Sequence, residues 1–547
     1  MNKKDTLYSL LSLICLAIIP LYPNAVYAFT HSFGISYLLT GIIISMPIIA
    51  LILLVRRKWL YCVLASLLTI LALTDLTMVD LYHEYLLPGG IISTIKTNPQ
   101  EASEFCHTNL REVFHWIPLI ILCTASCLLY KPTSYRKMSV YITIALLLIM
   151  PAFVSYKLVG FYKGQLTLRY YADNRIWNRP PYNVPFQCIN AYKSIIRKRK
   201  LENMKNINMG ATRTTEPADK KEIYIFAIGE SLRYDNVSLN KKYDRSTTPR
   251  LEAKESNLIL FDDYYSQACL TMYSVPQLIT RATPDNFELC YTERSIIEPF
   301  RECGFKVFTI VNNTNLLSYE TYLSDGADSL IIVPNIVEDG EILSGDKTIA
   351  HIVDSLAEQH DKLFIMMQFM GNHSFFTNYE KEFERYNPNS NNCRADLVRD
   401  SMMLINAYDN SILYTDYILS SIIEQIDKPN TVSAFIFVSD HGEAIVNGGA
   451  GHGGNCIPII EEYHVPFIFW WSDEYRRCYS DKVANALAHK HAKVNGDNIY
   501  YTLCDMADIQ LDTQYNNPTW SVLSDSFEEH ERLILVPDGV TCIYPDR

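Results

Sequence analysis

The chain has 547 residues, a formal net charge of -12 and 48% hydrophobic residues. This length exceeds that of one typical domain, so we expect more than one. The acidic balance argues against a general nucleic-acid binder, because such proteins neutralise phosphates with Lys and Arg. Most long apolar runs precede residue 157 and most charged residues follow it, which predicts a membrane part followed by a soluble part.

Five apolar segments in the first part are each close to the ~20 residues that a membrane helix needs. They cover residues 7–28, 36–55, 59–79, 113–130 and 138–156. The third contains Asp75, and the fourth has a short apolar core. Buried helices of a soluble protein are the alternative, but these segments have almost no amphipathic period. We therefore predict a five-span transmembrane domain over residues 1–157.

The basic residues predict the orientation of these spans. Lys and Arg gather at residues 3–4, 56–58 and 131–137, whereas the alternate loops, 29–35 and 80–112, carry few. Basic loops stay in the cytoplasm, so five spans place everything after residue 157 outside it. The first segment, which ends in "NAVYA", also resembles a signal peptide. We favour a retained anchor, and cleavage would leave the soluble part on the same side.

Nine of the 14 cysteines follow residue 157, and in an oxidising compartment we expect some to pair.

Residues 158–220 are predicted to be a linker with interfacial helices. "AYKSIIRKRK" (191–200) is a basic helix candidate that suits either anionic head groups or plain solvent. The polar stretch "NMGATRTTEPADKK" (208–221) is interpreted as a hinge.

A catalytic domain is predicted for residues 221–547. Continuous apolar runs at 222–228, 306–311, 363–369, 432–438 and 465–471 alternate with helix-like stretches. This pattern is typical of a parallel sheet covered by helices on both faces. Such sheets place their sites at the carboxyl ends of the strands.

Candidate metal ligands follow two of these strands. Glu230 lies two residues beyond the first, and Asp440 and His441 follow the fourth. Carboxylate oxygens and imidazole nitrogens are ordinary zinc ligands. A metal there would lower the pKa of a bound hydroxyl, which Thr271 could supply. Thr271 begins a helix, where a phosphate is also stabilised, so its hydroxyl is either a nucleophile or a simple helix cap.

Two further histidines lie in loops of the same domain. His373 comes after the third strand, and His452 lies in the glycine-rich "GGAGHGGN". A single loop histidine is more often structural than functional, and "DHG" alone is a weak motif. Because all these residues follow strands or occupy a glycine-rich loop in one domain, they favour a metal-dependent hydrolase or transferase.

The motifs "GESLRYDNVSLN", "LTMYSVP", "QFMGNHSFF", "FVSDHGE" and "GHGG", in this order behind five apolar segments, resemble the phosphoethanolamine transferases of Gram-negative envelopes. That family includes polymyxin (colistin) resistance enzymes and belongs to the alkaline phosphatase and sulfatase superfamily. The resemblance implies an α-helical membrane domain plus an alkaline-phosphatase-like α/β/α sandwich with a mostly parallel sheet. It also implies an inner-membrane, multi-pass protein whose catalytic domain lies in the periplasm.

The resemblance further implies site residues. The family's Zn²⁺ ligands fall on Glu230, Asp440, His441 and the nucleophile Thr271. Its further histidines, which serve the phosphoryl group or a second zinc, fall on His373 and His452. The stretch "TIKTNPQEASEF" is similar to a family segment that meets the substrate, and it suggests Thr97 and Glu101. The chain departs from the family at Gln277, where relatives often carry a cysteine, so Cys269 cannot form that disulfide.

These observations predict ping-pong transfer of phosphoethanolamine from phosphatidylethanolamine, through Thr271, to an envelope glycolipid such as lipid A or a core sugar. A phosphoglycerol transferase is the nearest alternative. A sulfatase is less favoured, because "TMYSVPQL" lacks the C/S-x-P-x-R pattern that sulfatases need. A non-catalytic envelope scaffold remains a different class, and the intact ligand positions argue against it.

Overall fold

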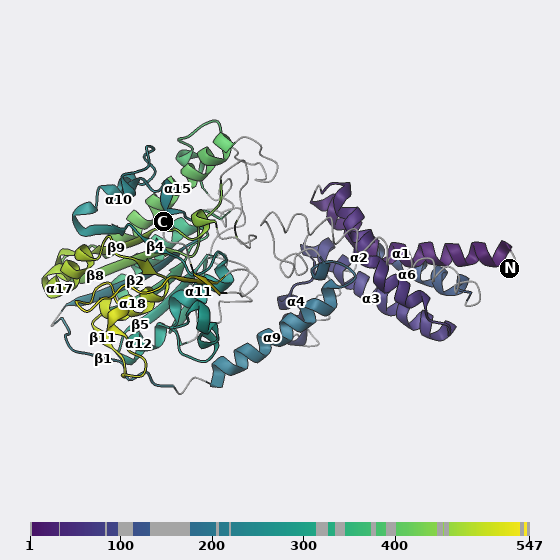
Figure 1. Ribbon diagram of the computed structural model, residues 1–547, viewed down its shortest axis with the longest axis horizontal. Helices are drawn as coiled ribbons and strands as arrows, with labels where there is room; N and C mark the ends of the chain where they lie inside the picture. Colours follow the sequence, from purple (N-terminus) through teal and green to yellow (C-terminus); the bar gives the residue numbers. More distant parts are fainter. Residues whose placement is uncertain are drawn as a thin grey trace. The chain divides into compact units, whose positions relative to one another are not determined.

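The computed structural model describes residues 3–543 except 32, 83–84, 97–112, 132–175, 204–206, 218–219, 313–325, 334–344, 374–378, 390–400, 446–451, 453–458 and 536–540. The chain forms two compact units, Met1–Ile196 and Arg197–Arg547 (Figure 1).

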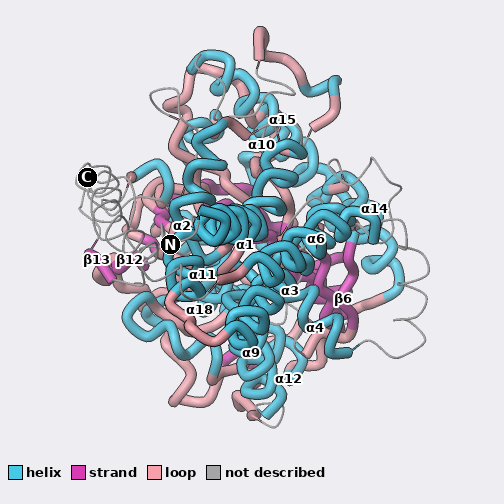
Figure 2. The backbone as a smooth tube through the Cα atoms, turned by 90° about the vertical axis from the view of Figure 1, so that its right-hand side faces the viewer, coloured by secondary structure: helices cyan, strands magenta, loops and turns pink. Residues whose placement is uncertain are grey.

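The described part of the N-terminal unit is built from helices (Figure 2). They are α1 (Lys3–Thr30), α2 (Ile35–Leu53), α3 (Lys58–Tyr82), α4 (Pro88–Lys96), α6 (Val113–Leu129) and the start of α9 (Asn183–Asn203). α1, α2, α3 and α6 coincide with four of the five predicted segments, and segment 138–156 lies outside the described residues. Among the described residues, two helical stretches are long and apolar enough to cross a membrane, Leu7–Thr30 and Lys58–Leu81. Two shorter helices are also apolar, Tyr37–Leu53 and Phe114–Leu129.

The charged residue in the third predicted span has a partner within this unit. Asp75 is only 1% exposed, and its Oδ1 accepts a hydrogen bond of 2.7 Å from Asn183 Nδ2 at the start of α9. Asn183 also donates to the carbonyl oxygen of Leu86. A carboxyl group in an apolar helix is normally turned inward and hydrogen-bonded in this way.

The C-terminal unit contains a seven-stranded sheet. In spatial order the strands are β3 (Leu258–Phe261), β9 (Phe467–Trp471), β8 (Thr431–Ser439), β2 (Lys221–Gly229), β7 (Lys362–Gln368), β5 (Lys306–Val311) and β6 (Ser329–Ile332). The predicted parallel arrangement is confirmed for β8, β2, β7, β5 and β6. The four-residue strands β3 and β6 are too short to stand out in the sequence.

The fifth predicted strand runs the opposite way. β9 is antiparallel to both β8 and β3, which is consistent with the prediction of a mostly, not fully, parallel sheet. The described residues just after β8 and just before β9 bond to each other at the carboxyl edge: Gly442 N–H donates to the carbonyl of Glu462, and Ser439 N–H to that of Pro466. β9 therefore begins near the point where β8 ends and runs in the reverse direction.

Helices cover both faces of the sheet, because each strand is apolar on both sides. Tyr224, Phe226 and Ile228 of β2 belong to one core and Ile223, Ile225 and Ala227 to the other. The first core packs against α11 (Thr271–Ile279), α12 (Ile297–Glu302), α16 (Asp473–Cys478), α17 (Ser480–Ala488) and α18 (Asp497–Met506). The second packs against α10 (Pro249–Glu252), α14 (Asp346–Gln359) and α15 (Ser401–Ile426). The predicted α/β/α sandwich with a mostly parallel sheet is confirmed.

The polar stretch interpreted as a hinge is partly built into this unit. Its strand β1 (Thr212–Arg213) pairs with β11 (Ile509–Gln510), and Met209 is fully buried in the first core. Arg213 forms two hydrogen bonds with the carboxylate of Glu222, at 3.0 and 2.6 Å. A buried, bidentate ion pair cannot be recognised in sequence, where both residues look like solvent-exposed charges.

Three short ladders complete the unit: β1 with β11, β4 (Tyr264–Tyr265) with β10 (Val494–Asn495), and β12 (Leu533–Leu535) with β13 (Thr541–Ile543). Two of its buried cysteines, Cys269 and Cys504, are free thiols. The expectation that cysteines of this unit pair therefore does not hold for these two.

Candidate metal centre

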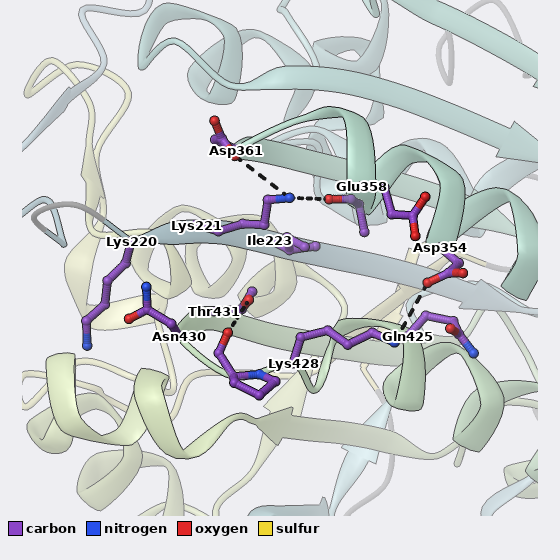
Figure 3. A pocket seen from close by; sticks show the side chains of 12 residues that line it. Lys220, Lys221, Ile223, Asp354, Glu358, Asp361, Gln425, Lys428, Asn430 and Thr431 are labelled. Carbon is purple, nitrogen blue, oxygen red and sulfur yellow. Dashed lines mark hydrogen bonds and ion pairs between the residues drawn. The ribbon is translucent and has the colours of Figure 1, made fainter.

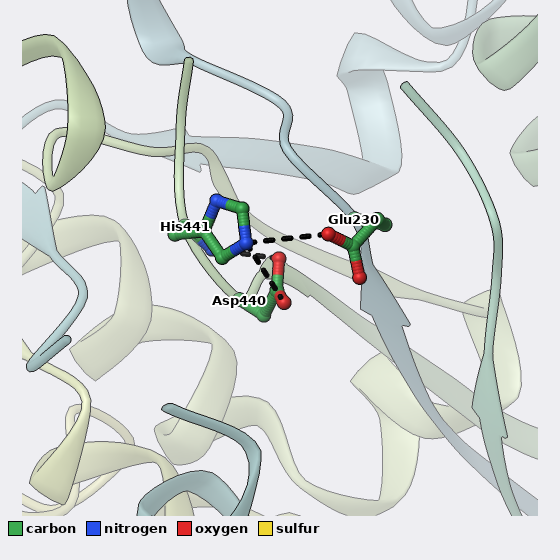
Figure 4. Close-up of side chains that lie close together, drawn as sticks. All are labelled: Glu230, Asp440 and His441. Carbon is green, nitrogen blue, oxygen red and sulfur yellow. Dashed lines mark hydrogen bonds and ion pairs between the residues drawn. The ribbon is translucent and has the colours of Figure 1, made fainter. Parts of the chain in front are cut away.

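Two adjacent parallel strands, β2 and β8, bring the predicted ligands to one edge of the sheet. β2 ends at Gly229, which lies opposite Ser439, the last residue of β8. Glu230 therefore leaves the sheet beside Asp440 and His441, and one ligand atom from each lies within 4.8 Å of the others (Figure 4). All three side chains are buried, with Glu230 6% exposed and the other two 0%.

The imidazole of His441 is fixed by its neighbours. Its Nδ1 lies 2.9 Å from the carbonyl oxygen of Gly442. A carbonyl only accepts, so Nδ1 carries the proton and Nε2 faces the carboxylates. Nε2 lies 3.2 Å from Glu230 Oε1 and 3.5 Å from Asp440 Oδ2. A histidine ligand of zinc is commonly held by such a hydrogen bond on its other nitrogen.

The electrostatics of this cluster favour a cation. Burial opposes ionisation of Glu230, but the hydrogen bond and positive charge of His441 prevail and lower its pKa to about 2. Burial, with the charge of Glu230, raises the pKa of Asp440 to about 7. Burial lowers the pKa of His441, but Asp440 and Glu230 reverse this and raise it to about 10. The two buried carboxylates thus lie close together, and a positive charge between them stabilises the ionised form of both.

Thr271 completes the cluster. It is the first residue of α11, and the residue in the cap position is Leu270, which offers no side-chain acceptor. Thr271 Oγ1 lies 3.3 and 3.2 Å from the two carboxylate oxygens of Glu230, and 3.3 Å from His441 Nε2. The hydroxyl therefore faces the candidate ligands and does not cap its own helix.

The motif around Thr271 also fastens this helix to the ligand loop. Ser274, one turn after Thr271, donates a hydrogen bond of 2.5 Å from Oγ to the carbonyl oxygen of Asp440. Ser266 donates to the same carbonyl, and the two hydroxyls lie 3.1 Å apart. The serine of "TMYSVP" thus fixes the distance between the threonine and the backbone of Asp440.

The two loop histidines lie beside this cluster. The ring of His452 is 4.1 Å from that of His441, centroid to centroid, and the ring of His373 is 6.2 Å from that of His452. Glu443 Oε2 lies 2.7 Å from His452 Nδ1, so this nitrogen donates to the carboxylate. Glu443 was not predicted as a site residue, although it ends the motif "SDHGE" two residues after His441. Thr97 and Glu101, the residues predicted to meet the substrate, lie outside the described residues.

A surface cavity of about 860 Å³ lies at the other end of the strands (Figure 3). It is lined by Lys221 and Thr431, where β2 and β8 begin, and by the ends of α14 and α15. Its lysines are paired with acids: Lys220 with Glu474, Lys221 with Asp361 and Lys428 with Asp354. Little uncompensated charge remains there for a ligand, which distinguishes this cavity from the carboxyl edge.

The residues at the carboxyl edge fit a zinc ion. The donor set is two carboxylates, one imidazole nitrogen and one hydroxyl, all of which are zinc ligands in proteins. Asp440 Oδ2 is buried and has no hydrogen-bond partner among the described residues. A buried carboxylate oxygen without a donor is costly, and a metal ion would satisfy it.

Comparison with known proteins places this site in a family. A model described as "Sulfatase" matches residues 222–509, which is more than half of the chain. The chain belongs to the sulfatase family. Among sulfatase-family proteins, the phosphoethanolamine transferase EptA of Salmonella typhimurium is 26% identical over 400 residues, which are 69% of this chain and 68% of that protein.

Two solved structures of the same superfamily share the fold. The integral membrane lipooligosaccharide phosphoethanolamine transferase A of Neisseria meningitidis has a TM-score of 0.61 at 17% identity, covering 95% of this chain and 98% of that one. The periplasmic domain of EptC from Escherichia coli, in complex with Zn, has a TM-score of 0.53 at 23% identity, covering 60% and 94%. At these identities the likeness shows the fold, which is the alkaline-phosphatase-like architecture that the sequence predicted.

Proposed function

We propose that this chain is a zinc-dependent phosphoethanolamine transferase, which moves the group from phosphatidylethanolamine to an envelope glycolipid, lipid A or a core sugar. The observation that carries the proposal is the position of Thr271. Its hydroxyl is the one candidate nucleophile among the described residues that lies within 3.3 Å of both Glu230 and His441. It also begins a nine-residue helix, whose N-terminus stabilises a phosphate bound to that oxygen.

The relatives support the choice of transferred group. The similar protein from Salmonella typhimurium is named a phosphoethanolamine transferase. A relative from Escherichia coli, 28% identical over 291 residues, is named a Kdo(2)-lipid A phosphoethanolamine transferase. The E. coli domain crystallised with Zn supports the choice of metal for Glu230, Asp440 and His441.

In this mechanism a zinc ion held by Glu230, Asp440 and His441 would supply Lewis acidity and lower the pKa of the threonine hydroxyl. Thr271 Oγ1 gives up its proton and attacks the phosphorus, the bond to the diacylglycerol oxygen breaks, and that oxygen takes up a proton as diacylglycerol leaves. An acceptor hydroxyl or protonated phosphate oxygen then loses its proton and attacks the same phosphorus, the bond to Thr271 Oγ1 breaks, and Oγ1 is reprotonated. His452 and His373 hold the oxygens of the transferred group in both steps.

The proposal includes the membrane. Donor and acceptor are lipids, so residues 1–157 serve as a five-span inner-membrane anchor, residues 158–220 as the linker, and residues 221–547 as a periplasmic catalytic domain. The basic loops at residues 3–4, 56–58 and 131–137 support this orientation. A reporter that is active only in the cytoplasm, fused after Arg547, should stay silent, and a bright signal would reverse the orientation.

Mass spectrometry tests the function directly. Lipid A and core sugars from a Gram-negative host with and without the chain should differ by one phosphoethanolamine, and Thr271→Ala should remove the difference. A phosphoglycerol increment would support the alternative transferase. No change in any glycolipid with a well-expressed, zinc-loaded chain would reject the transferase proposal.

A further inference from the structure

The loop that carries His373 lies directly on the backbone of Glu230. After β7, Phe369 N–H donates to the carbonyl of Ile228, at 3.1 Å, and Asn372 N–H to that of Glu230, at 3.0 Å. Gly371 has a φ of 45°, and a Cβ there would lie 3.1 Å from the carbonyl oxygen of Glu230. The position of this loop is therefore coupled to the candidate metal ligand beneath it.

A second residue holds the same loop from the opposite side. Asp346 is the first residue of α14 and is 3% exposed. Its Oδ2 accepts a hydrogen bond of 3.0 Å from Gly371 N–H, and its Oδ1 accepts one of 3.3 Å from Met370 N–H. Asn312 Nδ2 donates to Oδ1 at 2.8 Å and orients the carboxylate. All three donors are uncharged amides, so this buried carboxylate is used to fix a backbone segment rather than to pair with a cation.

We propose that Asp346 is a positioning residue for His373. It acts through the peptide groups of Met370 and Gly371, which precede the histidine by three and two residues. The inference deepens the proposed function and rests on it, because it concerns the histidine that would hold the transferred phosphoryl group. His373 itself is exposed, and its N–H donates to the carbonyl of Met370, so its backbone follows any shift of that residue.

The substitution Asp346→Asn isolates this role, because it keeps the size of the side chain and replaces one acceptor oxygen by a donor. One of the two loop N–H groups then loses its acceptor. For the zinc-loaded full chain in detergent, we expect kcat for transfer to fall about tenfold, while zinc per chain stays unchanged. His373→Ala should lower it about 100-fold, as is typical for loss of a group that stabilises the reacting centre.

The double variant distinguishes positioning from general damage. If Asp346 acts through His373, adding Asp346→Asn to His373→Ala lowers kcat no further, whereas independent effects would multiply to about 1,000-fold. A matched control exists in Asp416 of α15, a buried carboxylate that likewise accepts two consecutive backbone N–H groups, from Arg250 and Leu251, at 2.9 Å each. Asp416→Asn should lower Tm but leave kcat unchanged. Multiplicative losses, or an equal loss of kcat in Asp416→Asn, would overturn the proposal.

Hydrogen exchange gives a readout that does not depend on the activity. The amides of Met370 and Gly371 should exchange at least about tenfold faster in Asp346→Asn than in Asp416→Asn or the wild type. Equal exchange rates would overturn the positioning role even if the transferase proposal holds. Faster exchange in a chain that transfers no phosphoethanolamine would instead reject the proposed function and keep the contact between Asp346 and the loop. If Asp346→Asn does not fold, Asn312→Ser, which removes only the orienting donor, should show the same pattern with a smaller loss.

Discussion

Gly442 is the position where one added methyl group should disturb the metal centre most. It directly follows His441, and its carbonyl oxygen accepts the Nδ1 proton of that imidazole at 2.9 Å. A Cβ at Gly442 would lie 2.1 Å from the carbonyl oxygen of Glu461 and 3.2 Å from Cβ of Arg233. Normal contact needs about 3.5 Å, so the backbone would have to move by roughly 1.4 Å.

The cost of Gly442→Ala follows from these contacts. Overpacking against backbone costs about 1–3 kcal/mol, and loss of the 2.9 Å hydrogen bond from Gly442 N–H to Glu462 adds about 1 kcal/mol. The free energy of unfolding should fall by about 2–4 kcal/mol, and Tm by roughly 4–8 °C. Because the carbonyl that orients the imidazole is displaced with the backbone, affinity for zinc should fall about 10–100-fold.

Differential scanning fluorimetry and competition with a zinc chelator measure these two quantities. Gly304→Ala is the matched control, since Gly304 has a φ of 82° and a Cβ added there would meet no neighbouring atom of the described residues within 4 Å. That variant should lose only about 1 kcal/mol through backbone strain and keep its zinc affinity. Wild-type zinc affinity in Gly442→Ala would refute the idea that this carbonyl sets the orientation of His441.

Three further outcomes are expected. Thr271→Ala should abolish transfer, measured by mass spectrometry of glycolipids, while zinc content and Tm stay close to wild type, and retained transfer would exclude Thr271 as the nucleophile. His452→Ala should slow turnover and keep at least one zinc per chain by atomic absorption, whereas His441→Ala should lose it, and equal loss would make His452 a primary ligand. Burial lowers the pKa of His530, but its hydrogen bond to Asp497 at 3.0 Å and the charge of that carboxylate raise it above the usual value of 6.5. The contact between His530 and Asp497 therefore stabilises the fold fully below about pH 6.5, and this stabilisation is lost as the pH rises through the raised pKa of His530. Asp497→Asn should accordingly lower Tm more at about pH 5.5 than at about pH 9. An equal loss of Tm at both pH values would refute this role of the contact.

The sheet and the clustering of the three candidate ligands were predictable for the same physical reason. Strands buried on both faces must be apolar throughout, so β2, β7 and β8 stand out as continuous runs. Residues that follow parallel strands must meet at the carboxyl edge, so the sequence alone predicts that Glu230 lies next to Asp440, as it does in the structure. The resemblance to phosphoethanolamine transferases added the proposed role of Thr271, which its position at a helix start left open.

The remaining features depend on contacts between residues far apart in the chain. β9 pairs antiparallel with β8, and sequence does not show this direction because an apolar run has the same composition either way. Ser274 and Asp346 reach the site by bonding to backbone groups, at Asp440 and Gly371, and backbone acceptors and donors leave no trace in sequence. The sequence therefore predicts which groups meet, while the groups that hold them in place emerge only from the fold.

The three histidines of the site differ in a way that fits their separate roles. His441 is fully buried, the His452 side chain is 21% exposed, and His373 is exposed, so accessibility rises from His441, which contacts Thr271, through the neighbouring His452 to His373. In His441 and His452 the Nδ1 proton is donated to an oxygen, Gly442 O and Glu443 Oε2 respectively, which leaves Nε2 to face a ligand. A buried imidazole held in this way suits a permanent metal ligand, whereas accessible ones suit a phosphate that must enter and leave with each turnover. We therefore expect the lipid phosphate to meet His373 first, then His452, and to reach the threonine oxygen last.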